Sequence, residues 1–200
     1  MDEVDRAIEA VRAGRTVVLP TDTVYGLATS ALRPEFAAGL YRVKGRDESQ
    51  PTALVASSLE MLFAWLPELG ERERRIAGGL LPGPFTLVLP NPGRRFRWLT
   101  GARTDAIGVR VPSFPEPARR VVDGAGCILA TSANDPGGPD PATLDDVPPR
   151  IREACAAEVD AGRLPGTAST VIDFTTAQPS VIREGAASSA EALARVRAAL

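Results

Sequence analysis

Two cations flank a glycine in the stretch YRVKGR, where Lys44 and Arg46 stand on either side of Gly45. A glycine lets the backbone approach a ligand closely, and a lysine point charge beside an arginine fork suits the oxygens of a phosphate group. The only acids close in sequence are Asp47 and Glu48, which follow the pair directly. A structural alternative is that both cations lie at the C-terminal end of a helix and complement its dipole. The pattern therefore predicts either an anion site or the basic end of a helix.

Histidine is absent from the 200-residue chain. Its absence excludes a serine-histidine catalytic triad, a histidine-ligated zinc ion and histidine as a general base. Any chemistry therefore depends on charge, on hydroxyl groups and on the groups that the substrates bring. This favours reactions governed by positioning and electrostatic stabilisation, of which transfer at a nucleoside triphosphate is the leading example.

Hydroxyl and amide side chains gather in two further stretches. In PTDTVYGLATS a predicted buried strand leads into Thr21, Asp22 and Thr23, and in TSANDPGG another strand leads into Ser132 and Asn134. Both stretches are also ordinary turn sequences, in which such side chains satisfy loose backbone groups. The functional alternative is a polar pocket floor and an anion-binding loop, since α/β folds place ligand sites at strand ends. The residues alone leave both interpretations open.

Two arginines lie in apolar predicted strands. Arg110 has valines on both sides in IGVRV, and Arg183 follows an isoleucine in VIREG. A charged side chain in a strand needs a partner or a solvent-exposed end, so each arginine holds either a ligand carboxylate or an acidic residue at a sheet edge. Ser169 opens the strand in GTASTV and has a similar choice between a turn and a ligand contact.

The composition describes a protein with a sizeable core and little surplus charge. The hydrophobic fraction is 44%, the formal net charge is -2 and the pI is about 5.4. We expect one domain, and the acidic pI argues against a protein that coats nucleic acid non-specifically. Cys127 and Cys155 stand beside small or apolar residues, which favours reduced, buried thiols. No apolar run reaches membrane-spanning length and MDEVDRAIEA does not resemble a signal peptide, so we expect a soluble cytoplasmic protein.

Hydrophobic periodicity predicts helices and short apolar strands along the chain. The predicted strands lie at residues 16–20, 52–56, 85–89, 107–111, 127–131, 169–174 and 180–184. The predicted helices begin near Val4, at Pro34, after Ser57 and at 71, two more span 115–123 and 149–157, and a last one follows Ser188. Ser57 with Glu60, and Ser188 with Glu191, match the capping-box pattern. The pattern indicates an α/β fold whose long loops at 90–104 and 132–148 carry function.

Several motifs, taken together and in this order, resemble the Sua5/YrdC family. They are PTDTVYGL, the K-x-R pair at Lys44 and Arg46, LLPGPFTLVLP, IGVRVP, the S-x-N pair at Ser132 and Asn134, and STVID. The resemblance runs from about residue 8 to residue 185, and K-x-R followed far downstream by S-x-N is the family's own signature. It implies an α/β fold in which a twisted mixed sheet is flanked by helices and has a large concave basic cavity. It also implies a single YrdC-like domain over residues 1–200, without the C-terminal domain of the longer Sua5 proteins.

The family members that this sequence resembles are threonylcarbamoyl-AMP synthases, which are nucleotidyltransferases. The resemblance implies that L-threonine, bicarbonate and ATP combine into threonylcarbamoyl-AMP and pyrophosphate, with Mg²⁺ accompanying ATP. The product then feeds the threonylcarbamoyladenosine modification of tRNA through downstream threonylcarbamoyl transferase proteins. This chemistry agrees with the missing histidines, because the carbamate of threonine itself attacks the α-phosphorus and the protein mainly aligns the reactants.

The resemblance also implies roles for individual residues. It assigns catalysis to Lys44 and Arg46, and it identifies no ligands for a metal ion. The implied ATP-binding residues are Lys44, Arg46, Gln50, Ser132, Asn134 and Arg183. The implied threonine-binding residues are Thr23, Arg110, Ala130 and Ser169.

Three positions depart from the family pattern. Gln50 stands where the family has an ATP-contacting asparagine, and Asp140 stands where a hydroxyl side chain touches ATP. Val55 replaces a threonine-contacting histidine, which puts the identity of the amino acid in question. An acid near phosphates is unfavourable unless a metal ion or a shifted backbone intervenes.

Two other functions are compatible with the resemblance. One is a YciO-like paralogue that binds double-stranded RNA or tRNA with weak or no synthase activity. Tight, salt-sensitive RNA binding without ATP turnover distinguishes it from a synthase, and the acidic pI argues against it. The other is a carbamoyl-transfer domain like those embedded in hydrogenase-maturation and antibiotic-tailoring enzymes, which carry further domains.

Overall fold

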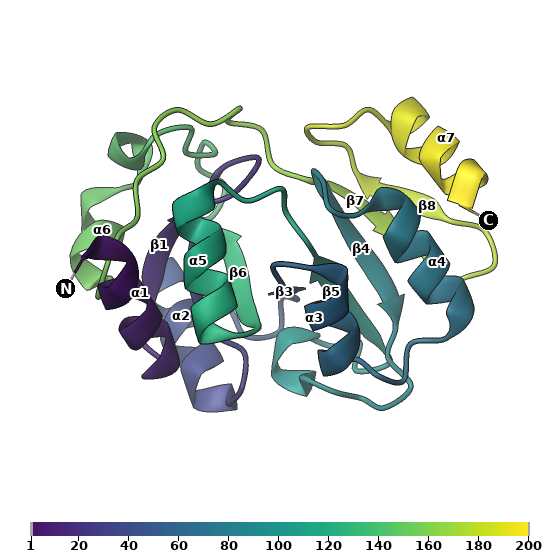
Figure 1. Ribbon diagram of the computed structural model, residues 1–200, viewed down its shortest axis with the longest axis horizontal. Helices are drawn as coiled ribbons and strands as arrows, with labels where there is room; N and C mark the ends of the chain where they lie inside the picture. The colour runs from purple at the N-terminus through teal and green to yellow at the C-terminus, as the bar shows by residue number, and fades with distance from the viewer. Residues whose placement is uncertain (1, 200) are drawn as a thin grey trace.

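A computed structural model describes residues 2–199 and shows one eight-stranded sheet with helices packed against it (Figure 1). In spatial order the strands are β1 (Val17–Pro20), β2 (Tyr25–Ser30), β6 (Ile128–Ser132), β3 (Ala53–Val55), β5 (Ala106–Arg110), β4 (Phe85–Pro90), β7 (Thr170–Asp173) and β8 (Ser180–Arg183). Strands β3 and β5 pair in parallel, as do β4 and β7, and the other neighbours are antiparallel. The predicted α/β class and mixed sheet are therefore confirmed.

Helices connect most of these strands and match the predicted positions. They are α1 (Glu3–Arg12), α2 (Pro34–Lys44), α3 (Leu59–Trp65), α4 (Glu71–Leu80), α5 (Glu116–Ala125), α6 (Pro149–Ala154) and α7 (Ser189–Ala199), with 3₁₀ turns η1 (Arg97–Leu99) and η2 (Leu144–Asp146). Helix α6 ends earlier than predicted because Cys155 is extended, with φ -89° and ψ 147°. Within residues 2–199, no helix has the length and apolar character needed to cross a membrane.

The YRVKGR stretch lies at a helix end, as predicted. Helix α2 ends at Lys44, and Gly45 follows in the left-handed conformation, with φ 68° and ψ 37°. Glycine adopts this conformation without the steric cost that a Cβ atom brings. The turn leaves Lys44 buried, with 5% of its surface exposed, and Arg46 half-buried at the start of the next loop.

Strand β2 is the one strand that the sequence did not predict. Its residues YGLATS are buried throughout, and β2 pairs with both β1 and β6. Small residues such as Gly26 and Ala28 carry little strand propensity, so the segment lacked the β-branched signature of the other strands. Thr21, Asp22, Thr23 and Val24 form the turn between β1 and β2, because Pro20 pairs with Tyr25 in the register.

Two local predictions need correction. Helix α3 is capped by Ser58, whose Oγ accepts a hydrogen bond from Met61 N at 3.1 Å, and not by Ser57. The helix begins at Leu59, so Ser58 is the residue whose side chain faces the free N–H groups of the first turn. Of the two free cysteines, Cys127 is buried as predicted, whereas Cys155 is only half-buried.

The two faces of the sheet differ in side-chain size. Large apolar residues such as Leu27, Leu54 and Leu129 pack against α2, α3, α4 and α7 on one face. Alternate residues point to the opposite face. There, helices α1 and α5 pack on each other and cover the strands of one half of the sheet. Over the rest of that face the side chains are too small to fill the space: Gly26, Ala28, Ala53, Ala106, Gly108 and Ala130.

A long segment without helix or regular strand crosses the molecule after α6 (Figure 1). Val159 N donates to Val18 O at 3.0 Å, and Gly166 N donates to Thr23 O at 2.9 Å. These bonds fix residues 155–169 along the end of the sheet from β1 to β7. The segment thereby brings Ala168 and Ser169 to the hollow face, far in sequence from the turn that they approach.

Candidate active site

A cavity of about 470 Å³ occupies the hollow face of the sheet. Its floor consists of the small residues of β2, β6, β3 and β5, which leave space where larger side chains would pack. Arginines supply all of the charge among the described residues that line it: Arg46, Arg103, Arg110 and Arg183. The cavity therefore attracts anions.

The strand registers place small residues side by side in the cavity floor. Ala53 of β3 lies between Ala130 of β6 and Gly108 of β5, so three small residues stand side by side across the sheet. A Cβ added to Gly108 would lie 3.7 Å from Ala53 Cα, which is ordinary contact, so the space above the glycine is free. Ala130, implied as a threonine-binding residue, lies in this floor and offers backbone and a methyl group.

Lys44 binds the loop that carries the S-x-N pair. Its ammonium donates to Ser132 O at 2.7 Å, to Asn134 O at 2.6 Å and to Asn134 Oδ1 at 2.5 Å. Ser132 Oγ also donates to Asn134 Oδ1 at 2.7 Å, and Asn134 Nδ2 donates to Gly138 O at 2.7 Å. Because a lysine has three N–H donors, these contacts use all of them. The K-x-R and S-x-N motifs therefore form one network across the sheet.

Arg46 lies on the cavity wall beside this network. It donates to Thr131 Oγ1 at 3.2 Å, to Gln50 Oε1 at 2.8 Å and to Pro51 O at 2.7 Å. All of its partners are neutral, and among residues 2–199 neither Arg46 nor Lys44 forms an ion pair. We call the region of Lys44, Arg46, Ser132 and Asn134 the cationic end. Its positive charge is not matched by a carboxylate of the chain within bonding distance.

Burial, and after it the neighbouring Arg46, lower the pKa of Lys44 to about 8. Removing an ammonium from water disfavours its charged form, and a second cation nearby adds to that cost. A bound anion would oppose both effects. The cationic end therefore gains from a negatively charged ligand.

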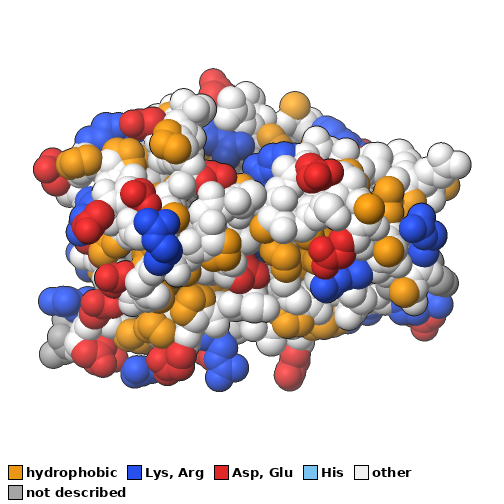
Figure 2. All heavy atoms as spheres, turned by 90° about the horizontal axis from the view of Figure 1, so that it is seen from above, with side chains coloured by type: hydrophobic (Ala, Val, Ile, Leu, Met, Phe, Trp, Pro, Cys, Tyr) orange, Lys and Arg blue, Asp and Glu red, His pale blue; other side chains and the backbone are white. Residues whose placement is uncertain are grey.

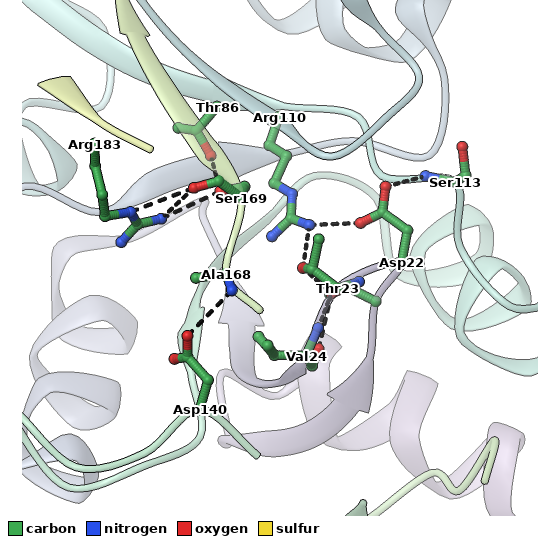
Figure 3. A network of polar contacts seen from close by, with 11 residues as sticks. Asp22, Thr23, Val24, Thr86, Arg110, Ser113, Asp140, Ala168, Ser169 and Arg183 are labelled. Atoms are coloured by element: carbon green, nitrogen blue, oxygen red, sulfur yellow. Dashed lines mark hydrogen bonds and ion pairs between the residues drawn. The ribbon is translucent and has the colours of Figure 1, made fainter. Parts of the chain in front are cut away.

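Arg110 is held from behind by the turn between β1 and β2 (Figure 3). Its Nη2 donates to Asp22 Oδ1 at 2.5 Å and to Thr23 Oγ1 at 2.6 Å. Asp22 Oδ2 accepts in turn from Ser113 N at 3.0 Å. The side chains of Arg110 and Asp22 are only 12% and 10% exposed. Strand β5 is interior, so the predicted alternative of an edge-strand arginine is wrong although its acidic partner is present.

The remaining nitrogens of Arg110 are available. Its Nε is buried and has no hydrogen-bond partner among the described residues. Its Nη1, which makes none of the drawn contacts, points into the space between Thr23 and Ser169 (Figure 3). We call the region of Arg110, Asp22, Thr23 and Ser169 the paired end, because its arginine is matched by an aspartate.

Thr23 stands behind Arg110 and is not on the cavity wall. It is 0% exposed, and Thr21, not Thr23, is among the lining residues. The resemblance implied a direct threonine contact for Thr23. In the structure it contacts Arg110 and thereby supports a residue that does line the cavity.

Ser169 and Arg183 meet on the wall beside Arg110 (Figure 3). Ser169 Oγ shares a hydrogen bond of 2.8 Å with Thr86 Oγ1, and its carbonyl accepts from Arg183 Nη2 at 2.8 Å. Arg183 lies on the edge strand β8 and is exposed. Its hydrogen-bond partners are oxygens of Ser169, so the predicted acidic partner across a sheet edge is not found among the described residues.

The three residues that depart from the family pattern differ in their contacts and in whether they line the cavity. Gln50 is exposed and accepts from Arg46. Asp140 does not line the cavity, and its Oδ2 accepts from Ala168 N at 3.1 Å. The carboxylate therefore fixes the segment that carries Ser169. Val55 lines the cavity directly beside Arg110, because the two pair in the register of β3 and β5.

Three residues of the site had no assigned role in the sequence. Asp22 orients Arg110, Thr86 binds Ser169, and Arg103 lines the cavity while it pairs with Asp173 at 3.2 Å. Asp22 stood in the predicted polar turn, which was the one signal that pointed to it. Arg103 lies in the long loop at 90–104 that was predicted to carry function, whereas Thr86, inside a predicted strand, carried no such signal.

The described residues do not form a protein cage for a metal ion. No group of three or more Asp, Glu, Cys or His side chains comes together within residues 2–199. Magnesium binds through few protein carboxylates and keeps water and phosphate ligands. Hydroxyl oxygens on the cavity walls, such as those of Ser132 and Ser169, would reach such an ion through a bound phosphate or water.

The face of the molecule drawn in Figure 2 has no continuous basic patch. Figure 2 shows Lys and Arg side chains interspersed with Asp and Glu side chains over the face that it draws. Non-specific nucleic-acid binding depends on positive charge gathered over one surface. The concentrated positive charge is inside the cavity instead.

Comparisons with known proteins place this chain in a defined group. A family model described as telomere recombination, that of the Sua5, YciO and YrdC proteins, matches residues 9–185. The threonylcarbamoyl-AMP synthase of Pyrococcus abyssi is 33% identical over 88% of this chain, which spans about half (52%) of that protein. The structure of P. abyssi Sua5 complexed with L-threonine has a TM-score of 0.82 at 32% identity, covering 92% of this chain and 55% of the other. E. coli YciO has a TM-score of 0.80 at 26% identity, covering 92% and 89%.

Proposed function

Because the chain belongs to the Sua5/YciO/YrdC family, we propose that it is a threonylcarbamoyl-AMP synthase. The reaction would convert L-threonine, bicarbonate and ATP into threonylcarbamoyl-AMP and pyrophosphate. The observation that supports this most directly is one cavity with two chemically different ends. The cationic end suits a polyanion, and the paired end suits an amino acid.

The triphosphate of ATP is proposed to bind at the cationic end. Arg46 has donors on the cavity wall and no carboxylate partner, so a phosphate would supply its missing counter-charge. Lys44 contributes its charge from behind the S-x-N loop, which it holds in place. Arg183 is exposed, lines the same cavity beside Ser169 and offers a further cation. Magnesium bound to the phosphate oxygens would neutralise part of the charge that develops on pyrophosphate.

The amino acid is proposed to bind at the paired end. Its carboxylate would meet the free Nη1 of Arg110, with the hydroxyl of Ser169 on the other side. Asp22 and Thr23 orient the guanidinium through its Nη2, which leaves Nη1 to the ligand. An amino acid carries an ammonium as well as a carboxylate, so an arginine already matched by an aspartate suits its zero net charge.

The reaction needs alignment more than proton transfer. The amine of threonine joins bicarbonate to form a carbamate, with loss of water. A carbamate oxygen then attacks the α-phosphorus, and the bond from that phosphorus to the β-phosphate oxygen breaks to release pyrophosphate. The small-residue floor between the two ends holds the reacting groups close together, and Arg46 stabilises charge on the departing pyrophosphate.

The product is proposed to serve tRNA modification in the cytoplasm. Threonylcarbamoyl-AMP is an activated acyl adenylate, so a downstream transferase must move its threonylcarbamoyl group to an adenosine of tRNA. Such transferase proteins would be the functional partners of this chain.

Pyrophosphate release from ATP tests the proposal. The purified protein should release pyrophosphate only when L-threonine and bicarbonate are both present. Arg119→Ala is a suitable control, because Arg119 pairs with Asp123 on the exposed side of α5 and does not line the cavity. Folded protein that binds tRNA or double-stranded RNA tightly but releases no pyrophosphate would favour the YciO-like alternative instead.

A further inference from the structure

A row of side chains crosses the sheet on either side of Arg110. Val55 pairs with Arg110 in the register of β3 and β5, and it pairs with Ile128 in the register of β3 and β6. All three line the cavity. Val55 therefore stands next to Arg110 on the cavity face, and Ile128 stands one strand further along the same row.

This part of the cavity is apolar. Leu19 also lines it, Phe114 faces it from the loop after β5, and helices α1 and α5 pack over it. We call the region of Leu19, Val55, Phe114 and Ile128 the aliphatic corner. Val55 is only 2% exposed and Ile128 only 1%, so little of each side chain reaches the open space, which favours a short ligand side chain.

The hydroxyl groups nearest this corner are already used. Thr21 Oγ1 donates its one proton to Val24 O at 2.8 Å and accepts from the backbone N–H groups of Thr23 and Val24. The proton in the 3.0 Å contact between Thr21 and Thr23 must therefore come from Thr23. Thr23 Oγ1 also accepts from Arg110 and is 0% exposed. Among the described side chains lining the aliphatic corner, none offers a free partner to a substrate hydroxyl.

We propose that the aliphatic corner binds the side chain of the amino-acid substrate and that Val55 sets its specificity, so that valine is accepted as well as threonine. This inference rests on the proposed function. Threonine and valine have nearly the same shape and differ by one hydroxyl group in place of a methyl group. A corner without a free hydrogen-bonding partner gains little from that hydroxyl.

The expected discrimination is small for a physical reason. An apolar pocket rejects an isostere that differs by a hydroxyl by only about 100-fold, whereas a site that hydrogen-bonds the hydroxyl discriminates by about 10,000-fold or more. The wild-type protein should therefore discriminate between threonine and valine by no more than about 100-fold in kcat/KM, in either direction. Leucine should be a poorer substrate, because its longer side chain needs open space beside Val55 and Ile128, which are almost fully buried.

Two measurements on the full chain test the inference. The first is pyrophosphate release with threonine, valine or leucine at saturating ATP and bicarbonate. The second is calorimetric binding of each amino acid in the presence of ATP without bicarbonate, which needs no turnover. Val55→Thr adds a hydroxyl beside Arg110 and should raise the threonine-to-valine ratio at least tenfold. Val88→Thr is the matched control, because Val88 lines the same cavity beside Gly108 and should leave the ratio unchanged.

The outcomes separate the inference from the proposed function. Turnover and binding of threonine with valine rejected more than about 10,000-fold would overturn the inference and leave the synthase proposal standing. An equal change of the ratio in Val55→Thr and Val88→Thr would also overturn the role of Val55. Binding of both amino acids without pyrophosphate release would support the corner and contradict the synthase. Absence of binding by either amino acid would contradict both.

Discussion

The two ends of the cavity differ in whether their cations are paired with a carboxylate of the protein. At the cationic end, Lys44 and Arg46 bond only to neutral oxygens, so no described carboxylate pairs with either cation and a bound anion would supply the counter-charge. At the paired end, Asp22 already neutralises Arg110, and both side chains are nearly buried. The difference matches the charges of the proposed ligands, a polyanionic triphosphate and an amino acid of zero net charge. It shows that the number of arginines on a cavity wall does not by itself tell which ligand each one takes.

The comparison also separates stability from binding. Removing a cation that bonds to neutral groups relieves a desolvation cost, whereas removing one partner of a buried ion pair leaves the other uncompensated. Substitutions at the two ends should therefore differ in how much they affect folding.

The largest expected effect is at the cationic end. Arg46→Ala should lower kcat/KM for ATP by about 100-fold to 1,000-fold, because it removes a charged donor from the proposed phosphate site. Its neutral partners can take water instead, so the melting temperature should change little. Steady-state kinetics and thermal unfolding measure both quantities, with Arg119→Ala as the surface control. A loss of folding without a specific loss of ATP use would make Arg46 a structural residue.

The paired end should respond in both folding and amino-acid binding. Asp22→Asn leaves Arg110 buried and unpaired, so the free energy of unfolding should fall by about 3 kcal/mol. The KM for threonine should rise about 30-fold, with the KM for ATP nearly unchanged, because the direction of Nη1 is no longer fixed. Chemical denaturation and kinetics check these values.

The matched control is Asp173→Asn, which changes the same residue type in the pair with the more exposed Arg103. It should cost at most about 1 kcal/mol. A lower KM for threonine in Asp22→Asn would show that Asp22 competes with the ligand for Arg110 and does not orient it.

Lys44 should behave as a residue that organises a loop. Lys44→Met removes three donors from oxygens of Ser132 and Asn134, which should lower the free energy of unfolding by about 2 kcal/mol. This loss exceeds the one expected for Arg46→Ala, although both residues belong to one motif. Urea unfolding of the two variants side by side tests the difference, and an unchanged stability of Lys44→Met would place its role in ligand binding alone.

The smallest expected effect is a pH dependence of the cationic end. The pKa of Lys44 is lowered to about 8, so raising the pH from 7 to 9 should remove most of its charge and raise the KM for ATP up to about tenfold. A lowered pKa in the folded state means that this group favours folding increasingly as the pH rises above 8, so the change is not unfolding. Kinetics at saturating bicarbonate should show a flat profile for Lys44→Met, and an unchanged slope in that variant would assign the pH effect to another group.

Several features were predictable because they depend on residues close together in the chain. Pro34 and Gly45 bound α2, the apolar runs mark most strands, and the ordered motifs identified the family, which the matching family model confirms. Strand β2 was missed because its small residues have weak strand propensity and are held by pairing on both sides. The cap of α3 was misplaced by one residue, since two adjacent serines fit the pattern equally well.

The sequence by itself determined the residue types of the site, the absence of histidine and the helix end that carries Lys44 and Arg46. Only the tertiary structure decided which of their donors are already used. Lys44 meets Ser132 across 88 positions of sequence, and Arg110 meets Asp22 across 88 as well. Local patterns fix secondary structure because neighbouring residues share one backbone geometry. The charge that remains for a ligand depends on partners that only folding brings together, which is why the sequence could name the cations and not their separate roles.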